Sequence, residues 1–135
     1  MRYLAIDLGD KRTGLATGDD ETHIATPAGV IEASKPQQRL SMIEQAIKLE
    51  MPDALVVGLP LNMDGSEGPA ATKSRQLADE LAARTGLVVH LADERLTSDA
   101  ADDALRQSGL TRKARKAHQD AQAAAAILNR FFSDR

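Results

Sequence analysis

The sequence predicts an α/β protein built on a mixed five-stranded sheet with helices on both faces. Three strand-like segments come first, before any helical pattern, and short apolar segments then alternate with helical ones. Consecutive strands joined by short turns pair antiparallel, whereas strand–helix–strand units add parallel strands to the same sheet. A length of 135 residues suits one domain, so we expect residues 1–135 to share one core.

The first three strands are expected within the first 32 residues. Residues 3–8 form an apolar run that ends in the turn residues Gly9 and Asp10. Residues 13–17 return antiparallel, and a third strand follows at 28–32. These segments form the antiparallel half of the sheet.

The first helix is expected to begin at Ser34. Gln37 lies three residues later and completes a capping box, and apolar residues recur at helical spacing over 40–47. Residues 51–53 end the helix. The fourth strand, 54–57, is wholly apolar, as suits a central strand covered on both faces.

A glycine-rich loop at 58–68 leads into the second helix. Pro69 is a good first-turn residue, and the helix runs through Arg84 until Gly86 stops it. The fifth strand follows at 87–91.

The C-terminal part is predicted to be helical, with one interruption. Thr97 or Ser98 caps a helix that ends near Gly109, and a last helix runs to about Phe132. The residues between them, 110–117, show no apolar periodicity and are expected to form a connection.

Composition excludes several classes of protein. Without cysteine there is no disulfide scaffold, zinc finger or thiol catalysis. The longest apolar run, 123–128, is too short to span a membrane, and no secretory segment precedes the first strand. We expect a soluble, cytoplasmic protein. A net charge of −3 argues mildly against a general nucleic-acid coat protein.

Asp7 lies inside an apolar strand. Burying a lone carboxylate costs several kcal/mol unless a partner compensates it. Either Asp7 caps the turn at Gly9, or a metal ion or another cation neutralises it.

Asp120 shares one face of the last helix with apolar residues. Its carboxylate either suits the dipole of the first helical turn or faces the sheet. The residues that share its face are Ala124, Ile127, Leu128 and Phe131.

Asp93, Glu94 and Arg95 directly follow the fifth strand, where open α/β sheets place their sites. Alone they suit a solvated corner, but together with Asp7 and Asp120 they form a set of carboxylates at strand ends or facing the sheet. The histidines show no ligand spacing. Any metal is therefore expected to be held by oxygen, as Mg²⁺ or Mn²⁺.

Two further features suit phosphate groups. Backbone N–H groups of the 58–68 loop, with Asn62 and Ser66 as side-chain donors, can hold a phosphate, although a compact surface loop looks the same. Basic residues also form clusters in the sequence. These clusters either bind phosphates or form an ordinary solvated surface. The residues are Lys11, Arg12, Arg112, Lys113, Arg115 and Lys116.

Four segments together resemble the YqgF family of Holliday-junction resolvase-like proteins, also described as pre-16S rRNA nucleases. The resemblance covers essentially the whole chain, in order and spacing. The segments are Asp7-Leu8-Gly9-Asp10-Lys11-Arg12-Thr13-Gly14-Leu15-Ala16, Val57 to Gly68, Asp93-Glu94-Arg95-Leu96-Thr97-Ser98, and Asp120-Ala121 before an alanine-rich helix.

The resemblance implies an RNase H-like fold and a nuclease in which Asp7, Glu94 and Asp120 bind one or two Mg²⁺ or Mn²⁺ ions. Lys11, Arg12 and Arg95 would then hold flanking phosphates, and the basic segment 112–116 would lie along the substrate strand. The implied partner is an rRNA precursor rather than a DNA junction, with ribosomal particles as further partners. Resolvases proper carry an acid near the end of the fourth strand; here the strand ends in Gly58-Leu59-Pro60, so the site relies on Glu94.

Three alternatives stay open at this point. A DNA junction resolvase would need a symmetric dimer to cut two strands, and the sequence fits a monomer or a homodimer. A non-catalytic, ribosome-associated RNA-binding module could keep the acids as a structural metal site. An actin-like phosphotransferase needs two such domains, and this chain supplies one.

Overall fold

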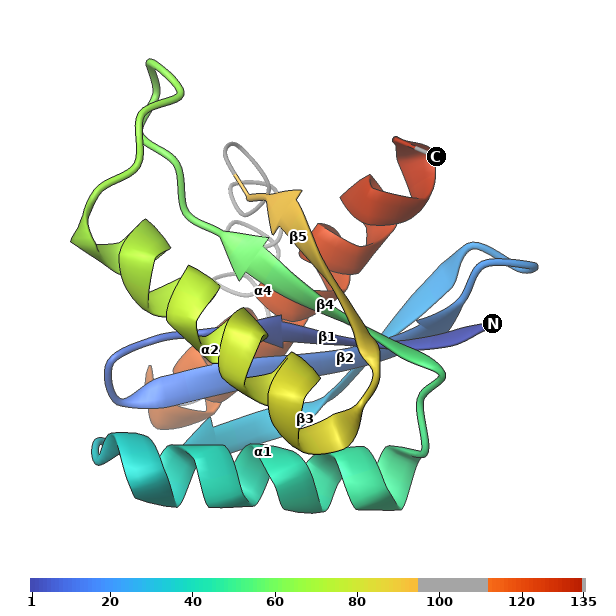
Figure 1. Ribbon diagram of the computed structural model, residues 1–135, viewed down its shortest axis with the longest axis horizontal. Coiled ribbons are helices and arrows are strands. Elements are labelled where there is room, and N and C mark those ends of the chain that lie inside the picture. Colours follow the sequence, from blue (N-terminus) through green and yellow to red (C-terminus); the bar gives the residue numbers. More distant parts are fainter. Residues whose placement is uncertain (95–111, 135) are drawn as a thin grey trace.

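The computed structural model describes residues 1–94 and 112–134, and side chains are described outside 112–118. Five strands form one sheet in the order β3-β2-β1-β4-β5 (Figure 1). The strands are β1 (Arg2–Asp7), β2 (Arg12–Asp19), β3 (Ile24–Glu32), β4 (Ala54–Leu59) and β5 (Val88–Asp93).

The pairing of the strands confirms the predicted mixed sheet. β1 pairs antiparallel with β2, and β2 pairs antiparallel with β3. β4 joins the other side of β1 in parallel, and β5 is parallel to β4. β1 and β4 are therefore central, and the carboxyl ends of β1, β4 and β5 meet at one edge of the sheet.

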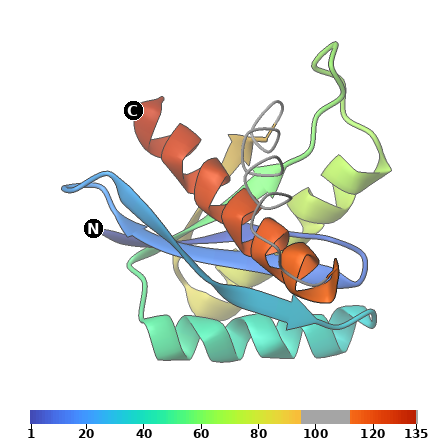
Figure 2. The same cartoon turned by 180° about the vertical axis from the view of Figure 1, so that it is seen from behind.

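Helices cover both faces. α1 (Pro36–Glu50) and α2 (Pro69–Thr85) lie on one face, and α4 (Arg112–Ser133) crosses the other (Figures 1 and 2). Among the helices of residues 1–94 and 112–134, none combines the length and apolarity needed to cross a membrane.

The predicted capping box at the start of α1 is wrong. Lys35 is the cap residue, with no side-chain cap hydrogen bond, and Pro36 takes the first helical position. The fixed φ of proline suits that position, so the helix starts two residues after Ser34 and leaves this serine and Gln37 out of capping range. The other end agrees with prediction, since Met51 adopts a left-handed conformation and its N–H donates to the Ile47 carbonyl.

α2 begins at Pro69 as predicted. Gly86, with φ of 72°, closes this helix, and its N–H donates to the Ala82 carbonyl.

α4, by contrast, begins at Arg112, so the predicted connection at 110–117 is wrong from residue 112 onward. Arginine, lysine and alanine are strong helix formers and need no apolar stripe to extend a helix. The helix predicted between Thr97 and Gly109 lies outside the described residues.

β3 is longer than the predicted 28–32 segment. It is an edge strand that contains Pro27 and is largely exposed, so it lacks the apolar alternation that marks a half-buried strand. The pairing with β2 shifts register between Leu15 and Ala16.

Two cores fill the two faces. The α1–α2 face is packed by large aliphatic side chains, among them Leu4, Ile6, Ile43, Leu55 and Leu81. The α4 face is packed mainly by alanines, together with an aromatic group at its far end. In that group the Tyr3 ring lies edge-on to Phe131 and Phe132, at centroid distances of 5.3 and 5.7 Å.

Candidate active site

Asp7 is the last residue of β1, and its side chain faces α4. Alternate residues of a strand point to opposite faces, and Tyr3 and Ala5 belong to the core under α4. In the pairing with β2, Asp7 lies opposite Gly14. The carboxylate is therefore at the carboxyl edge of the sheet, between the sheet and the helix.

Glu94 reaches the same place from the other side of β4. It follows β5 directly, and its N–H donates to the Leu59 carbonyl at 3.3 Å. Gly58 of β4 makes room for it, because a Cβ at Gly58 would overlap Glu94 Oε2 and lie 2.6 Å from Ile127 Cδ1. The Glu94 and Asp7 carboxyl groups form a hydrogen bond with one another. A glycine in the intervening strand thus allows acids from two non-adjacent strands to meet.

A second glycine brings Asp120 to this edge. A Cβ at Gly14 would overlap the backbone carbonyl of Asp120, so α4 lies directly on the backbone of β2. The Asp120 carboxylate is about a third exposed and accepts a hydrogen bond from Arg12 Nε at 2.8 Å. Asp120 is not in the first turn of its helix, which starts at Arg112, so the dipole does not explain its position.

Both half-buried acids, Asp7 and Glu94, have raised pKa values. Burial, the charge of Asp7, the hydrogen bond with Asp7 and the charge of Asp93 together raise the pKa of Glu94 to about 8. Burial also raises the pKa of Asp7; the hydrogen bond from Glu94 partly offsets this rise, and the charge of Asp120 adds to it. Near neutral pH the two groups therefore share a proton. A cation that replaced this proton would relieve the repulsion.

The chemistry of this pair fits a hard divalent cation. Mg²⁺ and Mn²⁺ take carboxylate oxygens, and Asp7 and Glu94 present theirs at one point. Within the described part of the chain, however, no three acidic or histidine side chains are gathered closely enough to hold a metal. Asp120, the third predicted ligand, is held by Arg12 instead.

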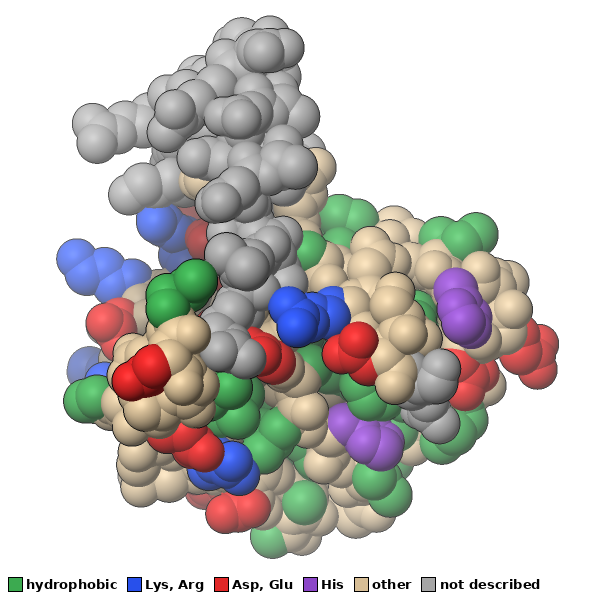
Figure 3. Space-filling view, turned by 90° about the horizontal axis from the view of Figure 1, so that it is seen from above, with side chains coloured by type: hydrophobic (Ala, Val, Ile, Leu, Met, Phe, Trp, Pro, Cys, Tyr) green, Lys and Arg blue, Asp and Glu red, His purple; other side chains and the backbone are tan. Residues whose placement is uncertain are grey.

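The predicted phosphate-binding cations are dispersed. Arg12 is paired with Asp120, and Lys11 lines a cavity between α1 and α2. Acidic side chains lie beside basic ones over the face seen in Figure 3. Arg95 lies outside the described residues. Four others, whose side chains are not described, lie in the first turns of α4: Arg112, Lys113, Arg115 and Lys116.

The two predicted donors of the 58–68 loop bond within the loop. Asn62 Nδ2 donates to Ser66 Oγ at 2.9 Å, and Ser66 Oγ donates to Asp64 Oδ1 at 2.6 Å. Leu61 and Glu67 form an antiparallel bridge across it. The loop is thus an internally bonded hairpin that projects beyond the carboxyl end of β4 (Figure 1).

Sequence reasoning missed the part that Gly14 and Gly58 play in the site. The available signal was a glycine inside each of two strands, which weakens a strand unless another group approaches closely there. Each supplies that close approach, one to the α4 backbone and the other to the Glu94 carboxyl group.

The sheet order and the position of α4 define an RNase H-like fold. Over 99% of this chain and 95% of the other, it is similar to Thermus thermophilus RuvC in complex with a Holliday junction substrate, with a TM-score of 0.60 at 17% identity. It is also similar to the fowlpox virus resolvase in complex with Holliday junction DNA, with a TM-score of 0.63 at 8% identity over 99% and 98% of the two chains.

Sequence comparison narrows this class to one family. The chain belongs to the RuvX family, described as Holliday junction resolvase, whose profile matches residues 1–134 and which is the YqgF family of the resemblance above. A relative from Anaeromyxobacter sp. (strain Fw109-5) is 42% identical over 100% of this chain and 98% of its own length. Another, from Maridesulfovibrio salexigens, is 38% identical over 98% of each. Both are named "Putative pre-16S rRNA nuclease". The chain is thus a member of a nuclease family.

Proposed function

We propose that this protein is a divalent-metal-dependent nuclease that hydrolyses phosphodiester bonds during 5′-end maturation of pre-16S rRNA in the cytoplasm. The observation that carries the proposal is the hydrogen-bonded pair of Asp7 and Glu94 at the carboxyl edge of the sheet. Folding alone gives no reason to bring two acids together under a helix, because each raises the cost of ionising the other.

RNA is favoured over DNA by the relatives of the chain. The two described above match along nearly their whole lengths, and their names specify pre-16S rRNA. The description of the family favours the second candidate, cleavage of a DNA four-way junction. Junction cleavage needs two copies of the site related by two-fold symmetry, so that candidate predicts a dimer.

Asp7 and Glu94 would hold Mg²⁺ or Mn²⁺, and Asp120 would join them once its carboxylate leaves Arg12. The bound metal would neutralise charge on the phosphate and lower the pKa of water. On binding a metal, Asp7 and Glu94 would give up their shared proton. Arg12, once released from Asp120, would be free to hold a phosphate of the substrate beside the acids.

Arg95 and the basic residues at the start of α4 would hold the phosphates that flank the cleaved bond. Such contacts position a strand and carry little sequence information. With three aromatic residues in the chain, and with Tyr3 and Phe132 buried, recognition by base stacking has little support.

The test offers three substrates in parallel to the purified protein with Mg²⁺ or Mn²⁺: a pre-16S rRNA fragment, single strands and a four-way DNA junction. We expect cleavage of the rRNA precursor and its loss in Glu94→Gln. Preferential cutting of the junction would establish the second candidate. RNA binding without cleavage, unchanged when Asp7, Glu94 and Asp120 are all replaced by amides, would instead indicate a non-catalytic binding module.

A further inference from the structure

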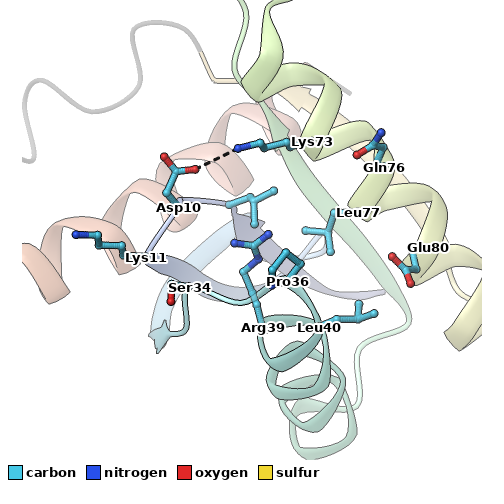
Figure 4. Close-up of a pocket in the computed structure, with 11 residues that line it drawn as sticks. Asp10, Lys11, Ser34, Pro36, Arg39, Leu40, Lys73, Gln76, Leu77 and Glu80 are labelled. Carbon is cyan, nitrogen blue, oxygen red and sulfur yellow. Dashed lines mark ion pairs between the residues drawn. The ribbon is translucent and has the colours of Figure 1, made fainter.

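A cavity of about 490 Å³ opens between α1 and α2 (Figure 4). The turn between β1 and β2 completes its wall. Leu40 and Leu77, which line it, belong to the aliphatic core on the face opposite Asp7. The cavity is therefore separate from the candidate active site, and its volume is in the range of small-molecule sites.

Cations from three elements line this cavity together with apolar side chains. Lys11 comes from the β1–β2 turn, Arg39 from α1 and Lys73 from α2. Lys73 reaches across to Asp10 at 3.6 Å, as the dashed line in Figure 4 marks. Both partners are well exposed, so this ion pair contributes little stability and an incoming anion can replace it.

The other two cations have no such partner within the described part of the chain. Arg39 is half-buried and donates from Nη1 to the Gly9 carbonyl at 3.4 Å, which orients the guanidinium and leaves its other N–H groups available. Lys11 forms no ion pair with a described residue. Glu80, an acid that also lines the cavity, pairs with Arg84 of its own helix at 3.4 Å, so two cations of the lining remain unmatched and favour an anionic ligand.

Ser34 adds a hydroxyl donor to the same wall. This serine was the expected cap of α1, but α1 begins after Lys35, and the side chain of Ser34 lines the cavity instead (Figure 4). Hydroxyl, guanidinium and ammonium groups are all common partners of a phosphate.

We propose that this cavity binds one nucleotide through its phosphate monoester. The phosphate would lie among Lys11, Arg39 and Lys73, and the base would cover Leu40 and Leu77. A monoester carries nearly two negative charges, which match three cations better than the single charge of a phosphodiester inside a strand. The ligand is a free nucleoside monophosphate or the phosphorylated 5′ end of a strand. Binding here does not depend on cleavage by the acids.

The experiment titrates the protein in metal-free buffer with adenosine 5′-monophosphate and with adenosine, followed by calorimetry and amide chemical shifts. We expect the nucleotide to bind, to shift residues of the cavity wall, and to outcompete adenosine. Arg39→Ala should weaken binding about tenfold or more. Lys48→Ala removes an exposed charge from the other end of α1 and should bind like the wild type.

Equal binding of adenosine and its monophosphate, or no binding by the wild-type protein, would overturn the proposal. So would wild-type affinity in folded Arg39→Ala. Should that variant fail to fold, Lys73→Ala, at an exposed side chain, tests the same contact and should also weaken binding.

Oligoribonucleotides identify the source of the ligand. If a 5′-phosphorylated oligomer displaces the nucleotide and its 5′-hydroxyl counterpart does not, the site holds strand ends; if neither does, it holds free nucleotides. Glu94→Gln should bind the nucleotide like the wild type, so failure of this proposal is distinguishable from failure of the nuclease assignment.

Discussion

The two faces of the sheet meet their helices in different ways. Large aliphatic side chains such as Ile43 and Leu55 separate α1 and α2 from the strands. On the opposite face, β2 presents the small residues Gly14, Ala16 and Gly18 to α4, and a Cβ at either glycine would overlap or crowd the helix. Large side chains therefore separate the sheet from α1 and α2, whereas α4 packs almost directly on the backbone of β2.

This difference explains why the acids lie under α4. Interdigitated aliphatic side chains bury more apolar area and stabilise the fold, but they leave no room for a carboxyl pair. The small residues under α4 contribute less burial, and they let Asp120 approach Asp7 and Glu94. We infer that the α1–α2 face mainly stabilises the fold and that the α4 face carries the chemistry; the following predictions test this division.

The largest effect is expected for Asp7→Asn. Cleavage in saturating Mn²⁺ should fall by at least about a hundredfold, since even residues that only support metal ligands cost 10–100-fold when changed. In metal-free buffer the variant should be as stable as the wild type or more so, because a buried charge beside Glu94 and Asp120 is removed. Cleavage assays and thermal melts measure both. Marked destabilisation would instead support a turn-capping role for Asp7.

Gly58→Ala should separate activity from stability. Its methyl group overlaps Glu94 Oε2 and crowds Ile127, so we expect a loss of about 1–3 kcal/mol in the free energy of unfolding and at least a tenfold loss of cleavage. Ile43→Val, on the other face, should cost about 0.5–1.5 kcal/mol and leave cleavage by the folded protein unchanged. Urea denaturation and single-turnover cleavage check this pair. Equal losses of cleavage in Gly58→Ala and Ile43→Val would contradict the proposed division of roles between the two faces of the sheet.

Millimolar Mn²⁺ or Mg²⁺ should raise the melting temperature, because the ions bind the folded acids and not the unfolded chain. At a hundred times the dissociation constant the gain is about 2.7 kcal/mol. Glu94→Gln should lose most of this gain, whereas Glu32→Gln, an exposed residue of β3, should keep it. A wild-type protein that does not respond to either metal contradicts the site.

The stability of the metal-free protein should fall as pH rises from about 4.5 to about 8. The pKa of Glu94 is raised from 4.5 to about 8 in the folded state, so across this window the folded protein binds more protons than the unfolded chain. We expect the melting temperature to drop by about 5 °C between pH 5.5 and pH 8.5, and Glu94→Gln to flatten the profile. Because metal displaces the same proton, the rise caused by Mn²⁺ should be larger at pH 8.5. A melting temperature that rises with pH over this range would contradict a proton shared between Asp7 and Glu94.

The smallest effect is expected for Arg12→Ala. The Arg12–Asp120 ion pair is about a third exposed on both sides, so its loss should change the free energy of unfolding by less than about 1 kcal/mol. RNA affinity should nevertheless fall, and the slope of its logarithm against the logarithm of salt concentration should decrease by about 0.7–0.9. If Arg12→Ala keeps the RNA affinity and the salt slope of the wild type, Arg12 does not contact the substrate and only pairs with Asp120.

The strands and the face of Asp120 were predictable because burial leaves a pattern in the sequence. The apolar run of β4 and the apolar stripe along α4 indicate directly which residues are buried in the core. Edge strand β3 and the start of α4 are solvated, so their sequences carry no such pattern and their bounds were misjudged. At α1, the capping motif was present, but proline at the next position overrode it.

Contacts within the site were harder to predict than its members. Asp7 and Glu94 stood out because acids rarely end buried strands, and the structure brings them together. That Arg12 would pair with Asp120, and Asn62 with Ser66, depends on distances between elements that the sequence does not encode locally. The cavity on the α1–α2 face had no signal at all, since its lining comes from separate segments.

The pairing of Asp7 with Gly14 makes the length of the turn between them critical. One extra residue in that turn would rotate every side chain of β2 to the opposite face. Thr13 and Leu15 would then point at α4, and the glycines would point into the aliphatic core. The pairing of β2 with β3 already accommodates a register shift, between Leu15 and Ala16, and β3 is an edge strand, so the turn between these two strands can accept insertions. We therefore expect natural length variation in this family to be absent from the first hairpin turn and to accumulate in the second.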